Sequence, residues 1–222
     1  MQVLFYLDIR ILASQADRLA EQITPSRREQ TARLRGEQDR LRSLAAGLFL
    51  AHLAAGQEVL YGERGKPYLS GGPHFNLSHS GDFICCAVSD SPVGVDLEFR
   101  RGKARNFTMM ARRAFHPEEQ AFFFRHPGEK TFLDIWTLKE SRIKMTGTGF
   151  STPPASFSAL PDDAALSGPL LPGTWEKIIA GQHCSFRRWD ALPGYSLAAC
   201  SAAPDPWEIH EFNEILAANL TP

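Results

Sequence analysis

Apolar residues recur along the N-terminal part of the chain with two different periods. Residues 3–9 are apolar except for Asp8, and such a short run predicts a first β-strand. Residues 25–60 instead carry apolar positions at helical spacing, which predicts one long helix through Leu41, Leu44, Ala45, Leu48, Leu50 and Leu53. Thr24 and Pro25 fit the start of this helix as N-cap and first helical residue.

The central segment changes to a pattern that is typical of strands. Residues 62–72 are rich in turn-forming residues and are expected to be a loop. Residues 83–88 form an apolar run, and residues 93–98 form a second strand-like segment. Because residues 89–92 (Ser-Asp-Ser-Pro) supply turn chemistry between them, we expect the two strands to pair as a hairpin.

The rest of the chain begins with helical patterns and ends with strands. Helices are predicted for residues 107–115, from His116-Pro117 onwards, and for residues 131–145, where Gly147 would end the helix. Three strands are then predicted, at residues 156–160, 184–189 and 195–200.

The order of these elements indicates an internal duplication, although no sequence repeat is visible. Each half contains a strand, then helices, then strands, so the predicted fold class is α/β (α+β). The halves would span residues 1–103 and 104–222, and the charged stretch 100–105 would join them.

Composition excludes several classes of function. Of the 222 residues, 43% are hydrophobic, which is enough for an ordinary core. The formal net charge of −1 argues against general binding of nucleic acid or of a membrane surface. The N-terminus lacks the basic start of a signal peptide, and no apolar run is long enough for a membrane helix. The four cysteines have no metal-ligand spacing and are expected to be reduced thiols of a cytoplasmic protein.

Three acidic residues are the first candidates for chemistry. Asp96 and Glu98 share one face of a predicted strand, about 6–7 Å apart, and can bind one hard cation such as Mg²⁺. A solvated strand face explains the same pattern. Glu140 and Lys144 share one face of a predicted helix, where an ordinary surface ion pair is the alternative.

Several polar and basic residues are candidates for binding an anion. Ser78 and His79 lie in a polar turn ahead of an apolar strand, where they can contact a phosphate or merely cap the turn. Lys66 lies in a loop, and Arg27 and Arg42 lie on a basic helix, where plain solvation is the alternative.

Each of these patterns has an ordinary explanation alone, whereas their order along the chain is specific. The segments are Gly65-Lys66-Pro67, Phe75-Asn76-Leu77-Ser78-His79-Ser80, Val93-Gly94-Val95-Asp96-Leu97-Glu98, Phe115 with Glu118-Glu119, and Trp136-Thr137-Leu138-Lys139-Glu140-Ser141 with Lys144. Together they closely resemble the 4′-phosphopantetheinyl transferases, specifically the larger, surfactin-synthetase (Sfp-like) type. The resemblance extends from about residue 24 to residue 157.

The resemblance implies a fold, a reaction and partners. The larger type is a pseudo-dimer of two similar α/β halves in one chain, with coenzyme A between them. Its members transfer the 4′-phosphopantetheine group of coenzyme A to a serine of a carrier protein and release 3′,5′-ADP. We therefore expect a monomeric enzyme with coenzyme A as substrate, an apo acyl or peptidyl carrier protein as partner, and Mg²⁺ or Mn²⁺ as cofactor.

The resemblance also implies roles for individual residues. Asp96, Glu98 and Glu140 would ligate the metal, with Asp96 thereby also contacting coenzyme A through its pyrophosphate. Glu140 would be the base for the carrier serine, and Lys144 would hold a pyrophosphate oxygen. Ser78 and His79 would contact a coenzyme A phosphate.

The nucleotide end of coenzyme A would meet basic residues. Lys66 and Arg42 are expected around it, and Glu119 matches an acidic position near the site. Where some relatives have two lysines for the 3′-phosphate, this chain has Arg27 and Gln30, so the nucleotide contacts are expected to differ.

The resemblance also predicts a docking surface, and two other functions would use the same residues. The carrier is expected near residues 105–125, where Met109, Met110, Phe122 and Phe123 would offer apolar contacts unless they belong to the core. A non-catalytic binding module is disfavoured because all three acids and Lys144 are present. A magnesium-dependent phosphohydrolase is disfavoured by the segments 75–80 and 136–141.

Overall fold

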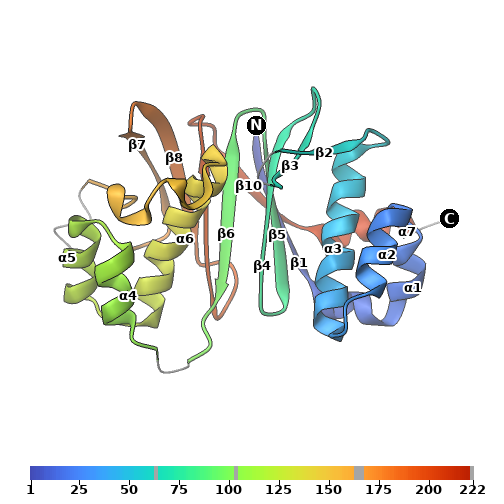
Figure 1. Ribbon diagram of the computed structural model, residues 1–222, viewed down its shortest axis with the longest axis horizontal. Helices are drawn as coiled ribbons and strands as arrows, with labels where there is room; N and C mark the ends of the chain where they lie inside the picture. Colours follow the sequence, from blue (N-terminus) through green and yellow to red (C-terminus); the bar gives the residue numbers. More distant parts are fainter. Residues whose placement is uncertain (63–64, 103–104, 163–167, 221–222) are drawn as a thin grey trace.

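Two four-stranded sheets face each other, and each is covered by helices on its outer side (Figure 1). This arrangement comes from a computed structural model, which describes residues 1–62, 65–102, 105–162 and 168–220. The predicted α/β class is confirmed.

The first sheet has the strand order β10-β1-β5-β4. β1 is antiparallel to β5 and parallel to β10. Its strands are β1 (Gln2–Asp8), β4 (His74–Ser80), β5 (Phe83–Ser89) and β10 (Trp207–Glu211). Its helices are η1 (Ile9–Gln15), α1 (Ala16–Ala20), α2 (Pro25–Ala32), α3 (Glu37–Ala54) and α7 (Phe212–Leu220). A short hairpin, β2 (Val59–Tyr61) with β3 (Pro67–Leu69), precedes β4.

The second sheet has the order β6-β9-β8-β7, with all neighbours antiparallel. Its strands are β6 (Val93–Phe99), β7 (Gly173–Ile179), β8 (Gln182–Trp189) and β9 (Tyr195–Ser201). Its helices are α4 (Phe107–Ala114), α5 (Pro117–Arg125), α6 (Glu129–Thr146), η2 (Gly149–Ser151) and η3 (Pro154–Ser156).

The chain passes from one sheet to the other after β5, so the predicted hairpin is wrong. β5 already pairs with β1 and β4 on its two sides, and no edge is left for β6. β6 therefore pairs with β9 in the second sheet. β6 belongs to the second sheet, and β10 returns to the first. The division of the chain at residue 103 and the duplication itself stay predictions.

Four local predictions are also wrong. The helix predicted over residues 25–60 is two helices, because Arg33 ends α2 and Gly36 adopts an extended conformation before α3. β3 lies inside the segment that we expected to be a loop. Residues 156–160 form no strand, because their buried side chains, Phe157, Ala159 and Leu160, pack into the core without a strand partner. The polar turn expected at Ser78 and His79 is wrong too, because residues 74–80 pair with β5 along their whole length as β4. The sequence patterns did not predict β2, β7, β10, η1, α1 or α7.

The core consists of layers that follow the two sheets. The inner faces of the sheets pack against each other through Leu4, Cys85, Ala87, Val93, Val95, Leu97, Trp189, Leu197 and Ala199. The outer faces pack under helices, with Phe49 and Leu48 of α3 on one side and Leu138 and Ile143 of α6 on the other. All four cysteines are free and buried. Among the described residues, no helix combines the length and apolarity that would let it span a membrane.

Candidate active site

The two sheets meet along β4 and β6, which are edge strands of their own sheets. Instead of a backbone ladder, alternate polar side chains of β4 accept backbone N–H groups of β6. Asn76 accepts from Val95 at 2.9 Å, Ser78 from Leu97 at 3.2 Å and Ser80 from Phe99 at 3.0 Å. These three hydrogen bonds fix the register of the seam, by which we mean the contact between β4 and β6.

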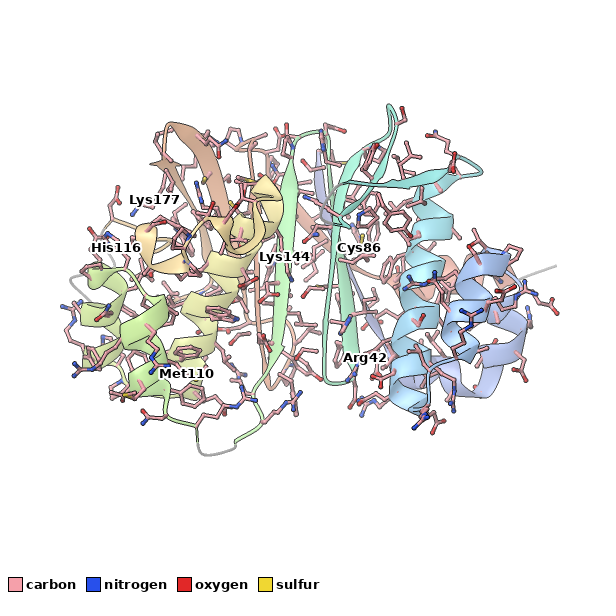
Figure 2. All side chains as sticks on the ribbon, viewed as in Figure 1. Arg42, Cys86, Met110, His116, Lys144 and Lys177 are labelled. Carbon is pink, nitrogen blue, oxygen red and sulfur yellow. The ribbon has the colours of Figure 1, made fainter. Side chains whose placement is uncertain are left out.

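Helix α6 lies directly on β6 because Gly94 has no side chain. A Cβ atom at Gly94 would lie 2.0 Å from the carbonyl oxygen of Ser141 and 2.3 Å from the backbone nitrogen of Met145. The alternation of β6 then turns Asp96 and Glu98 to the same side as Gly94, towards α6. This close approach brings Lys144 to the seam (Figure 2).

Ser78, Asp96 and Lys144 form one hydrogen-bonded cluster from three different elements. The Lys144 Nζ atom lies 2.6 Å from Asp96 Oδ1 and 3.0 Å from Ser78 Oγ, and Ser78 Oγ donates to Asp96 Oδ1 at 3.0 Å. Burial is the largest single influence and favours the neutral amine, but the charge of Asp96, its hydrogen bond and the charge of Glu140 together raise the pKa of Lys144. Lys144 is therefore a cation in the middle of the seam.

Glu98 and Glu140 add two more carboxylates beside Asp96. The pKa of Glu98 is raised by burial and then by the charge of Asp96. The pKa of Glu140 is raised by burial, then by Asp96 and, more weakly, by Glu98. Asp96 Oδ2 and Glu140 Oε1 are buried and have no hydrogen-bond partner. Since buried carboxylate oxygens are costly to leave unpaired, this cluster is suited to a bound cation.

The carboxylates fit a magnesium ion that retains water and substrate ligands. Over residues 1–62, 65–102, 105–162 and 168–220, no three His, Cys, Asp or Glu side chains converge closely enough to enclose an ion. Mg²⁺, however, is usually held by one or two carboxylates together with waters and phosphates, and not by a protein cage. The two unpaired oxygens of Asp96 and Glu140 match that requirement.

A cavity of about 270 Å³ opens at one end of the seam. Arg27, Arg42, Ser43, Asp39 and His79 are among its lining residues. Two nitrogens of Arg42 donate to the carbonyl oxygen of Gly81, at 2.7 and 3.2 Å, which holds the β4–β5 turn against α3. His79 is exposed on the strand, but its ring is partly shielded from water by its surroundings. This shielding lowers the pKa of His79, and the charges of Arg42 and Lys144 lower it further. Arg42 also pairs with Asp39 at 3.0 Å, so among the described lining residues Arg27 supplies the positive charge that is not offset, and this charge suits an anion.

Comparison with known proteins identifies the family. Residues 92–200 match the 4′-phosphopantetheinyl transferase superfamily. A 4′-phosphopantetheinyl transferase of Bacillus subtilis is 35% identical, with 90% of this chain and 91% of that protein aligned. The chain belongs to the 4′-phosphopantetheinyl transferase superfamily.

Other relatives support the same conclusion. Sfp from Bacillus subtilis strain 168 is 31% identical over 90% of this chain and 91% of its own length. AcpT from Escherichia coli K12 is 33% identical over 74% of this chain and 77% of its own length. The resemblance to the Sfp-like type is confirmed, and the protein is an enzyme, a phosphopantetheinyl transferase.

The predicted site residues of this transferase divide into two groups. Ser78, Asp96, Glu98, Glu140 and Lys144 come together at the seam. Arg27, Arg42 and His79 line the neighbouring cavity.

Lys66 belongs to neither group. Its Nζ atom bonds to the carbonyl oxygens of Val93 and Lys144, at the opposite end of β6 from Arg42 and Gly81. Gln30 is exposed on α2 and is not among the residues that line the cavity.

Two other predicted features lie away from the seam. Glu119 is fully buried against Lys139, so it is part of the core. Phe122 and Phe123 are also core residues, at 1% exposure each, and cannot offer a docking surface. Met109 and Met110 of α4 are exposed, as is Phe124 of α5 (Figure 2 labels Met110).

Sequence reasoning did not assign roles to Asn76, Ser80 and Gly94. The alternation Asn-x-Ser-x-Ser in residues 76–80 was the available signal, because it places three hydrogen-bonding side chains on one face of a strand. A larger cavity of about 510 Å³, between α1, α2 and α3, contains none of the predicted site residues.

Proposed function

We propose that the protein transfers the 4′-phosphopantetheine group from coenzyme A to a serine of an apo acyl or peptidyl carrier protein and releases 3′,5′-ADP. The observation that carries the proposal is the pair of buried, unpartnered oxygens of Asp96 and Glu140 beside the Lys144 ammonium group. The proposal includes a requirement for Mg²⁺, which Mn²⁺ would be able to replace. Of the three expected ligands Asp96, Glu98 and Glu140, Asp96 and Glu140 would hold the ion through their unpaired oxygens, and Glu98 would contact it through a bound water.

The transfer forms a bond from the serine oxygen to phosphorus and breaks the bond from phosphorus to the departing nucleotide phosphate. Glu140 would accept the serine proton, directly or through a water, because its carboxylate lies in the seam with an oxygen that has no hydrogen-bond partner. Lys144 would stabilise the negative charge on the leaving phosphate. When bound, Mg²⁺ would neutralise charge on the pyrophosphate of coenzyme A.

The cavity beside the seam would hold the nucleotide end of coenzyme A. Arg27, Arg42 and His79 supply positive or hydrogen-bonding groups there, and a guanidinium group can bind a phosphate through two hydrogen bonds. Ser78 already donates to Asp96 and accepts from Leu97, so its contribution would be to orient Asp96. Most of the rate enhancement would come from positioning and charge stabilisation.

The proposal also covers the setting in which the enzyme works. We place it in the cytoplasm as a monomer, with coenzyme A and carrier protein as partners and without a nucleic-acid or membrane partner. Buried free thiols fit a reducing compartment.

A mass measurement tests the reaction. The protein is incubated with coenzyme A, Mg²⁺ and an apo carrier protein, and the carrier is weighed by mass spectrometry. The expected result is a gain of one phosphopantetheine group, which is lost with a chelator and in Glu140→Ala.

Two other results would contradict the proposal. Absence of any gain with acyl and peptidyl carriers alike would favour a binding module. Release of phosphate without a carrier would favour a hydrolase.

A further inference from the structure

Lys66 contacts helix α6, which covers the second sheet, through its ammonium group. It belongs to the β2–β3 hairpin, which precedes the first-sheet strand β4 (Figure 1). The Nζ atom donates to the carbonyl oxygen of Lys144 at 2.7 Å, to that of Val93 at 3.1 Å and to that of Met145 at 3.5 Å. An ammonium group has three hydrogens to donate, and each of these has a backbone acceptor here.

Two of these carbonyl groups lie in the last turn of α6. The final carbonyls of a helix have no partner within the helix, and the negative end of the helix dipole favours a cation beside them. Val93 is the first residue of β6. Lys66 therefore ties the end of α6 to the start of β6.

Lys144 links this contact to the candidate site. Lys66 binds its backbone carbonyl, and its side chain is the central cation of the site. The side chain of Lys144 contacts Asp96 at 2.6 Å, whereas its carbonyl oxygen contacts Lys66 at 2.7 Å. Gly94 allows the backbone of this turn to lie against β6, with Lys144 C 2.9 Å from the position that a Cβ at Gly94 would occupy. The turn is thus fixed by close packing on one side and by the Lys66 ammonium group on another.

Burying the charged ammonium group of Lys66 at this position costs free energy. Lys66 is half-buried, and burial lowers its pKa to about 8. The three backbone carbonyls are its hydrogen-bond partners. A lysine kept under these conditions is engaged with the helix end and not with the anion-binding cavity, which contains Arg42 at the far end of β6.

We infer that Lys66 is a positioning residue of the transfer reaction, which holds the last turn of α6 so that Lys144 stays aligned with Asp96. This inference rests on the proposed function and deepens it. Small displacements of a reacting group cost about 100-fold in rate for about 1 Å. Loss of Lys66 should therefore lower the rate of the bound complex more than the affinity for coenzyme A.

Lys66→Met tests the inference, because methionine keeps much of the side-chain volume and removes the ammonium group. We expect kcat for carrier modification to fall about 10- to 100-fold. The dissociation constants for coenzyme A and for inorganic pyrophosphate, measured by calorimetry, should change less than about 3-fold. Without any ligand, the Gly147 amide, which donates to Ile143 at 3.0 Å in that last turn, should exchange its hydrogen faster.

Arg27→Met serves as the matched control, since it removes a cation from the cavity. That variant should weaken coenzyme A binding by at least about 10-fold, the loss of a charge-assisted hydrogen bond. Lys66→Arg should recover part of kcat because a guanidinium group can also donate to the carbonyls. If Lys66→Met does not fold, Lys66→Gln takes its place.

The measurements distinguish a positioning role of Lys66 from a role in binding substrate phosphate. Weakened binding of coenzyme A and of pyrophosphate by Lys66→Met, with kcat at saturation retained, would show that Lys66 binds substrate phosphate and would overturn the inference. An unchanged kcat beside an active wild-type protein would also overturn it. Absence of transfer by the wild-type protein would instead contradict the proposed function.

Discussion

Helix α6 carries two lysine–carboxylate pairs whose surroundings differ. Lys139 pairs with Glu119, and both side chains are fully buried. Lys144 pairs with Asp96, with 28% of the lysine side chain and 7% of the aspartate side chain exposed. Both pairs come from the same short stretch of sequence, so the difference lies in what else each pair contacts.

The Lys139 pair has a partner for each charged atom. Lys139 Nζ lies 2.5 Å from Glu119 and 2.6 Å from the carbonyl oxygen of Phe157, and 4.3 Å from the Phe157 ring centroid. Glu119 also accepts backbone N–H groups from His116 and Ala159, at 2.9 and 2.8 Å. Burial raises the pKa of Glu119 and lowers that of Lys139, and their mutual charge opposes both shifts. This pair joins α5, α6 and the segment around residue 157.

The cluster around Lys144 and Asp96, in contrast, contains carboxylate oxygens that have no hydrogen-bond partner. Asp96 Oδ2 and Glu140 Oε1 have no partner, and the neighbouring Glu98 and Glu140 hold raised pKa values. A pair whose partners are all present stabilises the fold, whereas one with unpaired oxygens among like charges is ready for a ligand. Among the described residues, buried carboxylate oxygens without a partner, and not the presence of an ion pair, distinguish the candidate site.

The largest expected effect comes from breaking the complete pair. Lys139→Met leaves the buried Glu119 carboxylate without a cation, so the free energy of unfolding should fall by about 3–5 kcal/mol. Lys144→Met should cost less, about 1–3 kcal/mol, because 28% of the Lys144 side chain is exposed although Asp96 stays buried. Urea unfolding followed by circular dichroism measures both.

A double variant isolates the cause of this loss. Glu119→Gln combined with Lys139→Met removes the charge and keeps one acceptor oxygen for His116 or Ala159, which bond to different oxygens of Glu119, so it should recover part of the lost stability. Equal losses in Lys139→Met and Lys144→Met would contradict the comparison.

A second prediction concerns the close approach that creates the Lys144 site. Gly94→Ala places a Cβ atom against the backbone of Ser141 and Met145. Because backbone cannot give way as a side chain can, we expect a loss of about 2–3 kcal/mol in unfolding free energy, together with loss of carrier modification.

Gly173→Ala is its control, since a Cβ in that β7 position meets no atom within 4 Å. This variant should remain active and as stable as the wild type. A fully active Gly94→Ala variant would show that α6 need not lie directly on β6.

Local patterns predicted the elements but not their assembly. α4, α5 and α6 follow from periodicity and from residues such as His116-Pro117 and Gly147, which act within a few positions of sequence. The position of β6 depends on the pairing of β5 with β1 and β4, which leaves β5 no free edge and is a long-range property. For the same reason the roles of Asn76 and Gly94 appear only when β4, β6 and α6 are seen together.

The candidate site was also predicted only in part, because sequence motifs do not give the spatial arrangement of every residue. The motifs predicted Asp96, Glu98, Glu140 and Lys144 as one group, and their side chains do come together at the seam. The resemblance implied Lys66 and Arg42 together around the nucleotide end of coenzyme A, but a motif does not say at which end of a strand a loop side chain lies. The roles of these residues stay predictions until the variants are measured.

A third prediction uses the cluster around Lys144 and Asp96 to gain stability. Glu140→Gln removes one of three like charges, so without metal the free energy of unfolding should rise by about 1 kcal/mol. The same variant should lose the increase in Tm that Mg²⁺ gives the wild-type protein, since binding to the folded state is what stabilises it. Thermal unfolding with Mg²⁺ and with a chelator measures both effects. A variant less stable than the wild type without metal would mean that Glu140 contributes to the fold as Glu119 does.

The smallest expected effect is the pH dependence of the difference in unfolding free energy between Glu140→Gln and the wild-type protein. The pKa of Glu140 is raised in the folded protein, so the folded state binds this proton more tightly than the unfolded state does. Below the ordinary glutamate pKa of about 4.3, both states are protonated, and wild type and Glu140→Gln should be equally stable. As pH rises through the raised pKa, the wild-type protein loses this contribution, and the variant should become relatively more stable until the difference levels off near about 1 kcal/mol. Urea unfolding between pH 4 and 8 without metal measures the difference, with the exposed Glu58→Gln as the control for the substitution itself. A difference that does not change with pH would show that repulsion among Asp96, Glu98 and Glu140 does not set the stability of the seam.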